Sequence, residues 1–165
     1  MVVAITEQVL GRQVRSALDI GCGEGRWGSA LRLLRPNIRT LGLESSEYAL
    51  RRFGRRRNIR RGTFGDLESL REKAFDLVLC VDVLHYVETR ELDRGLPALA
   101  GLTGGVAHLD VTTREDEPTG DLDGWIDRPA AWYQRRFRRA GLLSAGMMCW
   151  IPESLAEHLG TLDAP

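Results

Sequence analysis

The stretch from Ser16 to Gly28 constrains the fold of this chain more than any other part of the sequence. It opens with a short apolar run that has the length of a buried strand. Gly21, Gly23 and Gly25 follow at alternate positions, where the missing Cβ lets the backbone turn sharply and a ligand lie against the main chain. Apolar residues then recur at helical spacing until Pro36. Strand, glycine turn and helix form the first unit of a nucleotide-binding α/β fold, whose ligand is expected at the C-terminal end of the strand.

Two classes of ligand fit such a turn, and the charges around it separate them. Residues 23–28 read G-x-G-x-x-G, a pattern that also fits a dinucleotide coenzyme. A dinucleotide places its pyrophosphate at the helix N-terminus, where amide donors and the helix dipole favour negative charge. Here Asp19 stands at the strand end and Glu24 lies inside the turn, so two carboxylates flank the site. The turn therefore favours a cation over a diphosphate.

Residues 19–25, Asp-Ile-Gly-Cys-Gly-Glu-Gly, resemble the first motif of class I S-adenosylmethionine-dependent methyltransferases. The ligand of that family carries a sulfonium and an ammonium and has no phosphate. A second match lies in residues 73–87, where a nearly continuous apolar run predicts a central parallel strand. This block resembles the family's fourth motif, an F-D-x-V strand followed by a short x-x-L-x-x-V helix. The resemblance spans roughly residues 16–151 and implies S-adenosylmethionine as the cofactor.

The resemblance also implies which residues bind the cofactor. Glu44, at the end of the second expected strand, would accept hydrogen bonds from ribose hydroxyls, or else be an acid that the dipole stabilises at a helix start. Asp66 would bind the adenine amino group and Leu67 would pack on or bond to the base, although Asp66 equally suits a loop cap. The expected cofactor-binding residues are Asp19, Gly21, Cys22, Gly23, Gly25, Glu44, Ser45, Asp66, Leu67, Cys80 and Val81.

His85 and Asp82 are the candidate catalytic residues, because both follow the central strand at the ligand end. Methyl transfer is an in-line displacement at a methyl group already activated by positive sulfur, so the protein chiefly positions the acceptor and excludes water. A base is needed only where the acceptor nucleophile is protonated. His85 is also explained as a structural residue with a satisfied ring. The three histidines are too dispersed to indicate a metal site.

Length and composition set further bounds. The 165 residues fit one domain over positions 1–165, and the formal net charge of zero gives no overall field toward nucleic acid or an anionic membrane. Residues 51–61 hold seven arginines with no aromatic residue beyond Phe53, which favours a solvated helix end over a nucleic-acid patch. The three cysteines lack C-x-x-C spacing and favour a reducing, cytoplasmic setting. We find no signal-peptide pattern and no apolar run of transmembrane length.

The pattern as a whole predicts a Rossmann-like, doubly wound α/β fold with a mostly parallel sheet of about six strands. Residues 142–151 read as a single sixth strand, and residues 152–160 read as helix, so a seventh strand is expected to be missing. The open edge that this would leave favours pairing with a second chain in a homodimer.

Three functions stay open at this point. The first is a methyltransferase acting on a small-molecule acceptor. The second is a nicotinamide oxidoreductase, but short-chain members pair a catalytic Tyr with a Lys four residues on, and the chain's single lysine, Lys73, follows Ser69 at that spacing. The third is a catalytically silent S-adenosylmethionine-binding or interaction module, suggested by the short lead-in and the expected loss of the last strand.

Overall fold

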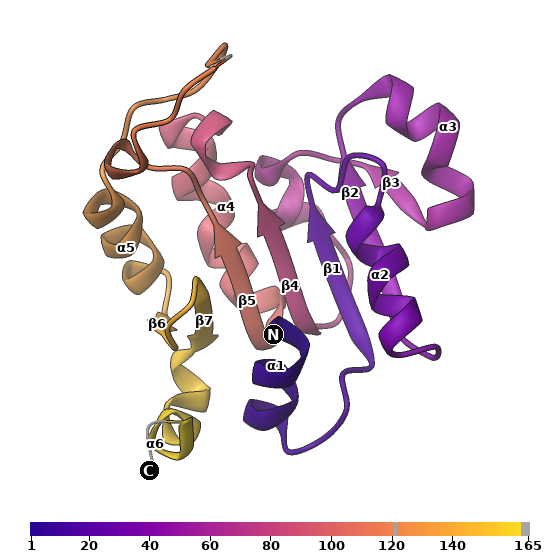
Figure 1. Cartoon of the computed structure of the whole chain (residues 1–165), viewed down its shortest axis with the longest axis vertical. Helices are drawn as coiled ribbons and strands as arrows, with labels where there is room; N and C mark the ends of the chain where they lie inside the picture. Colours follow the sequence, from indigo (N-terminus) through magenta and orange to yellow (C-terminus); the bar gives the residue numbers. More distant parts are fainter. Residues whose placement is uncertain (121, 163–165) are drawn as a thin grey trace.

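A computed structural model describes residues 1–120 and 122–162 of the chain. Its centre is a seven-stranded sheet in the order β3-β2-β1-β4-β5-β7-β6, with helices on both faces (Figure 1). The first five strands pair in parallel, whereas β7 runs antiparallel to β5 and β6 antiparallel to β7. The predicted Rossmann-like fold is therefore confirmed. The strands are β1 (Ser16–Ile20), β2 (Arg39–Glu44), β3 (Ile59–Arg61), β4 (Phe75–Val81), β5 (Thr103–Asp110), β6 (Leu142–Ser144) and β7 (Cys149–Pro152).

The helices follow the sequence signals for their ends. Gly25 precedes α2 in a left-handed conformation, the Ser46 hydroxyl accepts a hydrogen bond from Ala49 N at the start of α3, and Gly11 ends α1 with a φ of 61°. The α-helices are α1 (Val2–Leu10), α2 (Arg26–Leu34), α3 (Glu47–Arg57), α4 (Thr89–Leu102), α5 (Ala130–Arg139) and α6 (Leu159–Leu162). The 3-10 helices are η1 (Phe64–Ser69), η2 (Leu84–Tyr86), η3 (Arg114–Asp116) and η4 (Glu153–His158).

Each face of the sheet carries its own apolar core. On one face α4 and α5 pack on the strands through buried side chains such as Leu99 and Phe137. On the other face α1 and α2 do so through Val9 and Leu31 (Figure 1). Strand β4 lies at the middle of the sheet and, apart from Val81 at its end, is buried along its length. This two-sided burial explains its nearly continuous apolar sequence.

The expectation of a missing seventh strand is wrong. Residues 142–151, read as one strand, form two antiparallel strands joined by a tight turn. Gly146, Met147 and Met148 all have left-handed backbone, with φ of 78°, 51° and 61°, and Cys149 N donates to Gly146 O at 2.8 Å. Three consecutive left-handed residues reverse the chain inside a mostly apolar run whose one polar residue is Ser144. The sheet is complete, so the argument for a homodimer from a missing strand falls away.

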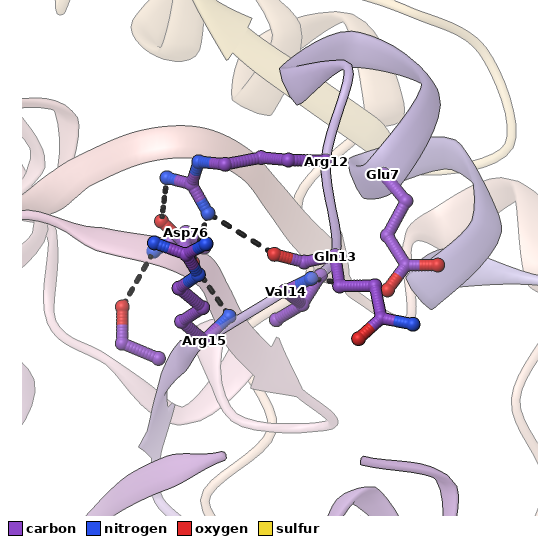
Figure 2. Close-up of polar contacts among 7 residues, drawn as sticks. Glu7, Arg12, Gln13, Val14, Arg15 and Asp76 are labelled. Carbon is purple, nitrogen blue, oxygen red and sulfur yellow. Dashed lines mark hydrogen bonds and ion pairs between the residues drawn. The ribbon is translucent and has the colours of Figure 1, made fainter. Parts of the chain in front are cut away.

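Ion pairs fix the edge of the sheet where the parallel strands begin. Figure 2 shows Arg12 reaching from the end of α1 to Asp76, with two hydrogen bonds of 2.9 and 2.8 Å. Asp76 also accepts a hydrogen bond from Arg15 N at 2.6 Å. Glu7 of α1 accepts from Val14 N and pairs with Arg35, which follows α2. These contacts tie α1 and the link to β1 onto the core.

Three general features of the described residues bear on the expected setting. Cys22, Cys80 and Cys149 are all buried free thiols. Within residues 1–120 and 122–162, no helix combines the length and apolar character that crossing a membrane requires. The same residues hold no group of three or more His, Cys, Asp or Glu side chains that could bind a metal ion.

Candidate functional site

The candidate site lies at the edge of the sheet where the parallel strands end. Strand β1 ends at Ile20, β2 at Glu44, β4 at Val81 and β5 at Asp110, and the arrowheads at the top of Figure 1 mark this edge. A cavity of about 210 Å³ opens there. It is lined by Ile20, Gly21, Glu44, Ser45, Gly62, Thr63, Phe64, Val83, Tyr86, Val87 and Glu91. Open α/β sheets bind ligands beyond the carboxyl ends of their strands, so this position is the expected one.

The glycine turn that follows β1 has the left-handed backbone that its sequence predicts. Gly21, Gly23 and Gly25 have φ of 68°, 52° and 74°. A Cβ on Gly21 would lie 2.4 Å from Val83 Cγ2, so this glycine lets the residue after β4 pack closely. A Cβ on Gly23 would meet no atom within 4 Å. Gly23 thus faces open space, where a ligand could lie against the main chain.

Glu44 joins the end of β2 to the glycine turn. Its Oε2 accepts a hydrogen bond from Gly23 N at 2.7 Å, and its Oε1 accepts from Ser45 N and Ser46 N, both at 2.8 Å. The half-buried carboxylate also lines the cavity. Both sequence interpretations therefore describe part of its position, because Glu44 bonds to amides at the start of α3 and also faces the cavity.

Asp19 is the most unusual polar residue of the site. It is 5% exposed, and its Oδ2 is buried without a hydrogen-bond partner in the described part of the chain. Burial, together with the negative charge of Glu44, raises the pKa of Asp19 to about 7. A buried acid without a partner is unfavourable for folding, and such groups gather at functional sites.

No basic side chain compensates these acids. The chain contains 22 arginines, yet among the described residues none of them, nor Lys73, forms an ion pair with Asp19, Glu44 or the two acids that follow β4 and end β5, Asp82 and Asp110. The polar groups at this cavity include carboxylate acceptors, backbone amides and the hydroxyls of Ser45 and Thr63. Such a set fits a ligand with a positive group and hydroxyls, and it does not fit a pyrophosphate.

The two candidate catalytic residues lie together beside this cavity. Asp82 directly follows β4 with a φ of 63°, and its side chain is 76% exposed. His85 lies three residues on, in η2, and is 2% exposed. Its Nε2 is 3.7 Å from Asp82 Oδ1, and its Nδ1 accepts a hydrogen bond from Thr112 N at 3.3 Å. Burial lowers the pKa of His85, although Asp82 and Asp110 act in the opposite direction.

The structure places some of the expected cofactor residues away from the cavity. Asp66 does not line it, because its carboxylate accepts hydrogen bonds within η1, including one from Thr63 N at 2.8 Å. The side chains of Leu67 and Cys80 are buried in the apolar core. Burial raises the pKa of the Cys80 thiol far above its usual value. Leu67 and Cys80 could therefore contact a ligand through backbone atoms, whereas the Asp66 side chain is exposed.

The remaining expected residues support the glycine turn. Cys22 N and Gly21 N both donate to Leu43 O, at 3.0 and 2.8 Å, which holds the turn against β2. Burial, with the charges of Asp19 and Glu44, raises the pKa of the Cys22 thiol to about 12. Gly25 begins α2, Ser45 is exposed at the cavity, and Val81 ends β4 next to Asp82.

Sequence reasoning missed part of the cavity wall. Thr63 and Phe64 line the cavity, three residues before the position expected to contact a base. The shift arises because β3 ends at Arg61 and the chain turns into η1 directly afterwards. Tyr86, which lies within the second motif, also lines the cavity and is 50% exposed, but the motif itself does not predict a site role for it.

Comparisons with known proteins agree with this geometry. A family profile described as a methyltransferase domain matches residues 18–104. No curated protein matches the chain in sequence. The fold is similar to that of a SAM-dependent methyltransferase from Archaeoglobus fulgidus, with 17% identity and a TM-score of 0.64 over 79% of this chain and 62% of that one. It is also similar to Streptomyces venezuelae DesVI, with 19% identity and a TM-score of 0.67 over 90% of this chain and 89% of that one.

A third similar structure is the plantazolicin methyltransferase BamL in complex with a triazolic desmethylPZN analog and SAH. It shares 17% identity and a TM-score of 0.61, over 98% of this chain and 59% of that one. The chain thus spans about six tenths of the length of the Archaeoglobus and plantazolicin enzymes. Structural likeness at this level of sequence identity shows only a shared fold. The match to the family profile shows a relationship in sequence as well. Because that profile matches more than half of its residues, the chain belongs to the methyltransferase domain family.

Proposed function

We propose that the chain is an S-adenosylmethionine-dependent methyltransferase that acts on a small-molecule acceptor by in-line methyl transfer. The observation that carries this proposal is the pair of acids on the glycine turn, Asp19 and Glu44, which have no basic partner among the described residues. A cationic ligand would supply the missing partner and offset the energy of burying Asp19. The family match supports the same activity.

We assign the positive end and the ribose of the cofactor to separate residues. Asp19 would bind the ammonium group, because it is the buried carboxylate that lacks a partner. Glu44 would accept hydrogen bonds from the ribose hydroxyls while keeping bonds to backbone amides, since each carboxylate oxygen can accept more than one. Gly21, Cys22, Gly23 and Gly25 would bring backbone close to the ligand, and Ser45 would flank the ribose.

The far end of the cavity would hold the adenine. Phe64 and Thr63 line that part, and an aromatic or apolar wall suits a flat base. Asp66 and Leu67 would then support this wall from η1, in place of the direct contact that the motif implies. Cys80 and Val81 would form the floor at the end of β4, next to the residues that face the acceptor.

The bound cofactor supplies a methyl group already activated for displacement, so the chain's own residues position and shield the reaction. Ile126 N donates to His85 O at 2.9 Å, and Trp125 Nε1 donates to Thr112 O at 3.5 Å. These bonds hold Trp125 and Ile126 against Thr112 and His85, close to the end of β4. We propose that these two residues form part of the acceptor pocket and limit the entry of water.

Three wider features belong to the same proposal. We expect residues 1–165 to act as one methyltransferase domain. The free, buried cysteines support a reducing, cytoplasmic setting. A homodimer that forms by strand pairing would use one of the outer strands, β3 or β6.

Titration calorimetry of the purified chain with S-adenosylmethionine, S-adenosylhomocysteine and NAD⁺ tests the proposal. We expect micromolar binding of the first two and none of NAD⁺. Binding of NAD⁺ alone would replace the proposal with a nicotinamide enzyme. Tight binding of S-adenosylmethionine without methyl transfer to any of a panel of amines, alcohols and thiols would favour the silent binding module.

A further inference from the structure

Asp82 occupies an exposed and conformationally unusual position at the end of the central strand. Its backbone is left-handed, with a φ of 63°, and Asp82 N donates to Asp110 O at 3.0 Å. Its neighbour Val83 packs on Gly21 and lines the cavity. Asp82 itself does not line the cavity; it precedes Val83 in the chain, and its carboxylate reaches Thr112, which follows β5.

The surroundings of His85 determine which of its nitrogens carries the proton. Thr112 N can only donate a hydrogen bond, so His85 Nδ1, 3.3 Å away, must accept it through its lone pair. In a neutral imidazole the proton then lies on Nε2, which is the nitrogen 3.7 Å from Asp82 Oδ1. The ring is buried and packs edge-on against Tyr86 at a centroid distance of 4.1 Å. The nitrogen of His85 that faces Asp82, Nε2, thus carries a hydrogen and has no free lone pair.

This arrangement reverses the roles that a histidine and an aspartate usually take in acid–base chemistry. His85 Nε2 lies 3.7 Å from Asp82 Oδ1, within ion-pair distance but beyond a hydrogen bond, and Thr112 Oγ1 donates to the same oxygen at 3.4 Å. Among the described residues, nothing bonds to the other carboxylate oxygen, Oδ2. Oδ1 is held by the protein, and Oδ2 is left for a ligand.

We propose that Asp82 contacts the methyl acceptor, that His85 is a positioning residue for Asp82, and that the acceptor is an amine. This inference rests on the proposed function and adds the substrate class. Asp82 and Asp110 both act electrostatically on His85, and among the described residues neither forms an ion pair with an arginine or lysine, so phenolates, thiolates and carboxylates are disfavoured as acceptors. A carboxylate is too weak a base to activate an alcohol efficiently, whereas it binds an ammonium group directly.

Protons, charge and electron pairs balance in the methyl transfer with Asp82 as the only ionisable protein group in contact with the acceptor. The bound ammonium gives one proton through Asp82 Oδ2 to solvent. The lone pair that this frees forms the new N–C bond, while the C–S bond breaks and its electron pair stays on sulfur. The positive charge passes from the sulfonium to the methylated ammonium, which Asp82 again balances.

The first test examines the protein without any acceptor. Nitrogen-15 NMR of histidine-labelled chain, saturated with S-adenosylhomocysteine, reports the tautomer of each imidazole, and the His85 signals are assigned by their loss in His85→Gln. We expect the Nε2–H form for His85 at pH 7.5. An Nδ1–H form would overturn the positioning role, because Nε2 would then offer a lone pair and His85 could itself be the base.

The second test uses a matched pair of probes, 2-phenylethylamine and 2-phenylethanol, titrated into chain saturated with S-adenosylhomocysteine. We expect the amine to bind about tenfold more tightly than the alcohol, and Asp82→Asn to remove that preference. Glu88→Gln is the control, because Glu88 is an exposed acid just beyond η2, and it should leave the preference unchanged. Equal binding of the two probes, absent binding of both, or an unchanged preference in Asp82→Asn would each overturn the proposal.

Two substitutions of His85 test the positioning role itself. His85→Gln keeps an N–H donor and should retain part of the amine preference. His85→Phe removes the donor, and its amine preference should fall as far as that of Asp82→Asn. Equal effects of Gln and Phe would contradict positioning through Asp82. S-adenosylhomocysteine affinity is measured for every variant and shows that each one is folded. Failure of the wild type to bind S-adenosylhomocysteine would reject the proposed function, whereas normal cofactor binding with no effect of Asp82 would reject only this inference.

Discussion

Acidic side chains lie both where the parallel strands begin and where they end, but their surroundings differ at these two edges of the sheet. At the edge where the parallel strands begin, Asp76 pairs with Arg12 (Figure 2) and Glu7 pairs with Arg35. Glu72, just before β4, likewise pairs with Arg39. At the edge where these strands end, Asp19 has a buried oxygen with no hydrogen-bond partner among the described residues. Surface acids at this edge, such as Glu24 and Glu47, do pair with arginines, but within the described part of the chain neither Asp19 nor Glu44 pairs with one.

The pKa values of Asp76 and Asp19 differ in the same way. Burial acts to raise the pKa of Asp76, but hydrogen bonds from Arg12 and Arg15 N outweigh it, and the pKa ends below its usual value. Asp19 has burial without such bonds, and its pKa rises to about 7. Asp76 is thus stabilised as a carboxylate at the first edge, whereas the second edge retains a buried acid whose charged form is unfavourable, as is common at functional sites.

The largest expected change comes from Asp19→Asn, and it depends on pH. Below about pH 4 the aspartate is protonated in both folded and unfolded chains, so the substitution alters stability little. As the pH rises toward 7 the unfolded chain ionises while the folded chain stays protonated, and the wild type loses stability. We expect the variant to gain about 3 kcal/mol in unfolding free energy at pH 8, measured by urea denaturation across this range.

The same variant should bind S-adenosylmethionine at least about tenfold more weakly, because the partner of the ammonium is lost. A variant that is no more stable than the wild type at pH 8 would show that Asp19 has a partner after all. It would also remove the contrast between the two edges.

Asp76→Asn tests the opposite edge. It removes the charge that holds Arg12 and should destabilise the fold by about 2 kcal/mol, a moderate value because the Arg12 side chain is 41% exposed. Cofactor affinity should change less than twofold. Glu72→Gln, which breaks a more exposed pair, is the matched control and should lower stability by less than about 1 kcal/mol. A large loss of affinity in Asp76→Asn would mean that the two edges are coupled.

Glu44→Gln keeps the size of the side chain and removes the charge at the ribose position. We expect S-adenosylmethionine affinity to fall about tenfold, since a neutral amide is a weaker acceptor than a carboxylate. Glu47→Gln, three residues on at the start of α3, pairs with Arg61 at the surface and should leave affinity unchanged. Similar affinities for both variants would make Glu44 only an acid that stabilises a helix start.

The smallest expected effects come from alanine at two left-handed glycines, and they distinguish backbone strain from a steric clash with the ligand. Gly23 and Gly11 have similar left-handed φ of 52° and 61°, and a Cβ would meet no atom within 4 Å at either position. Alanine at each should therefore lower stability by about 1 kcal/mol. Only Gly23→Ala should weaken S-adenosylmethionine binding, by about fivefold, because its methyl group enters the ligand's space. Equal affinity of the two variants would place the ligand away from the turn.

The sequence was informative where short-range spacing sets the geometry. Gly21, Gly23 and Gly25 adopt the predicted left-handed turn, and Glu44 lies beside them, because a βαβ unit brings the ends of neighbouring parallel strands together. Asp82 and His85 are also adjacent, since they are three residues apart on either side of one tight turn.

The rest depends on long-range packing that spacing does not encode. Arg12 and Asp76 are 64 residues apart, and the absence of any partner for Asp19 Oδ2 is visible only in three dimensions. The β6–β7 turn uses left-handed backbone at Met147 and Met148, residue types that do not signal a turn. That Thr63 and Phe64 line the cavity also depends on where the chain turns from β3, which ends at Arg61, into η1.

A crystal structure of the chain grown with S-adenosylhomocysteine would test the cation site most directly. We predict density in the cavity beside Gly21 and Glu44, with the amino group of the ligand paired to Asp19 Oδ2. Density for a phosphate-bearing molecule next to Asp19 and Gly23, or a ligand whose amino group lies away from Asp19, would contradict the interpretation of this edge as a cation site.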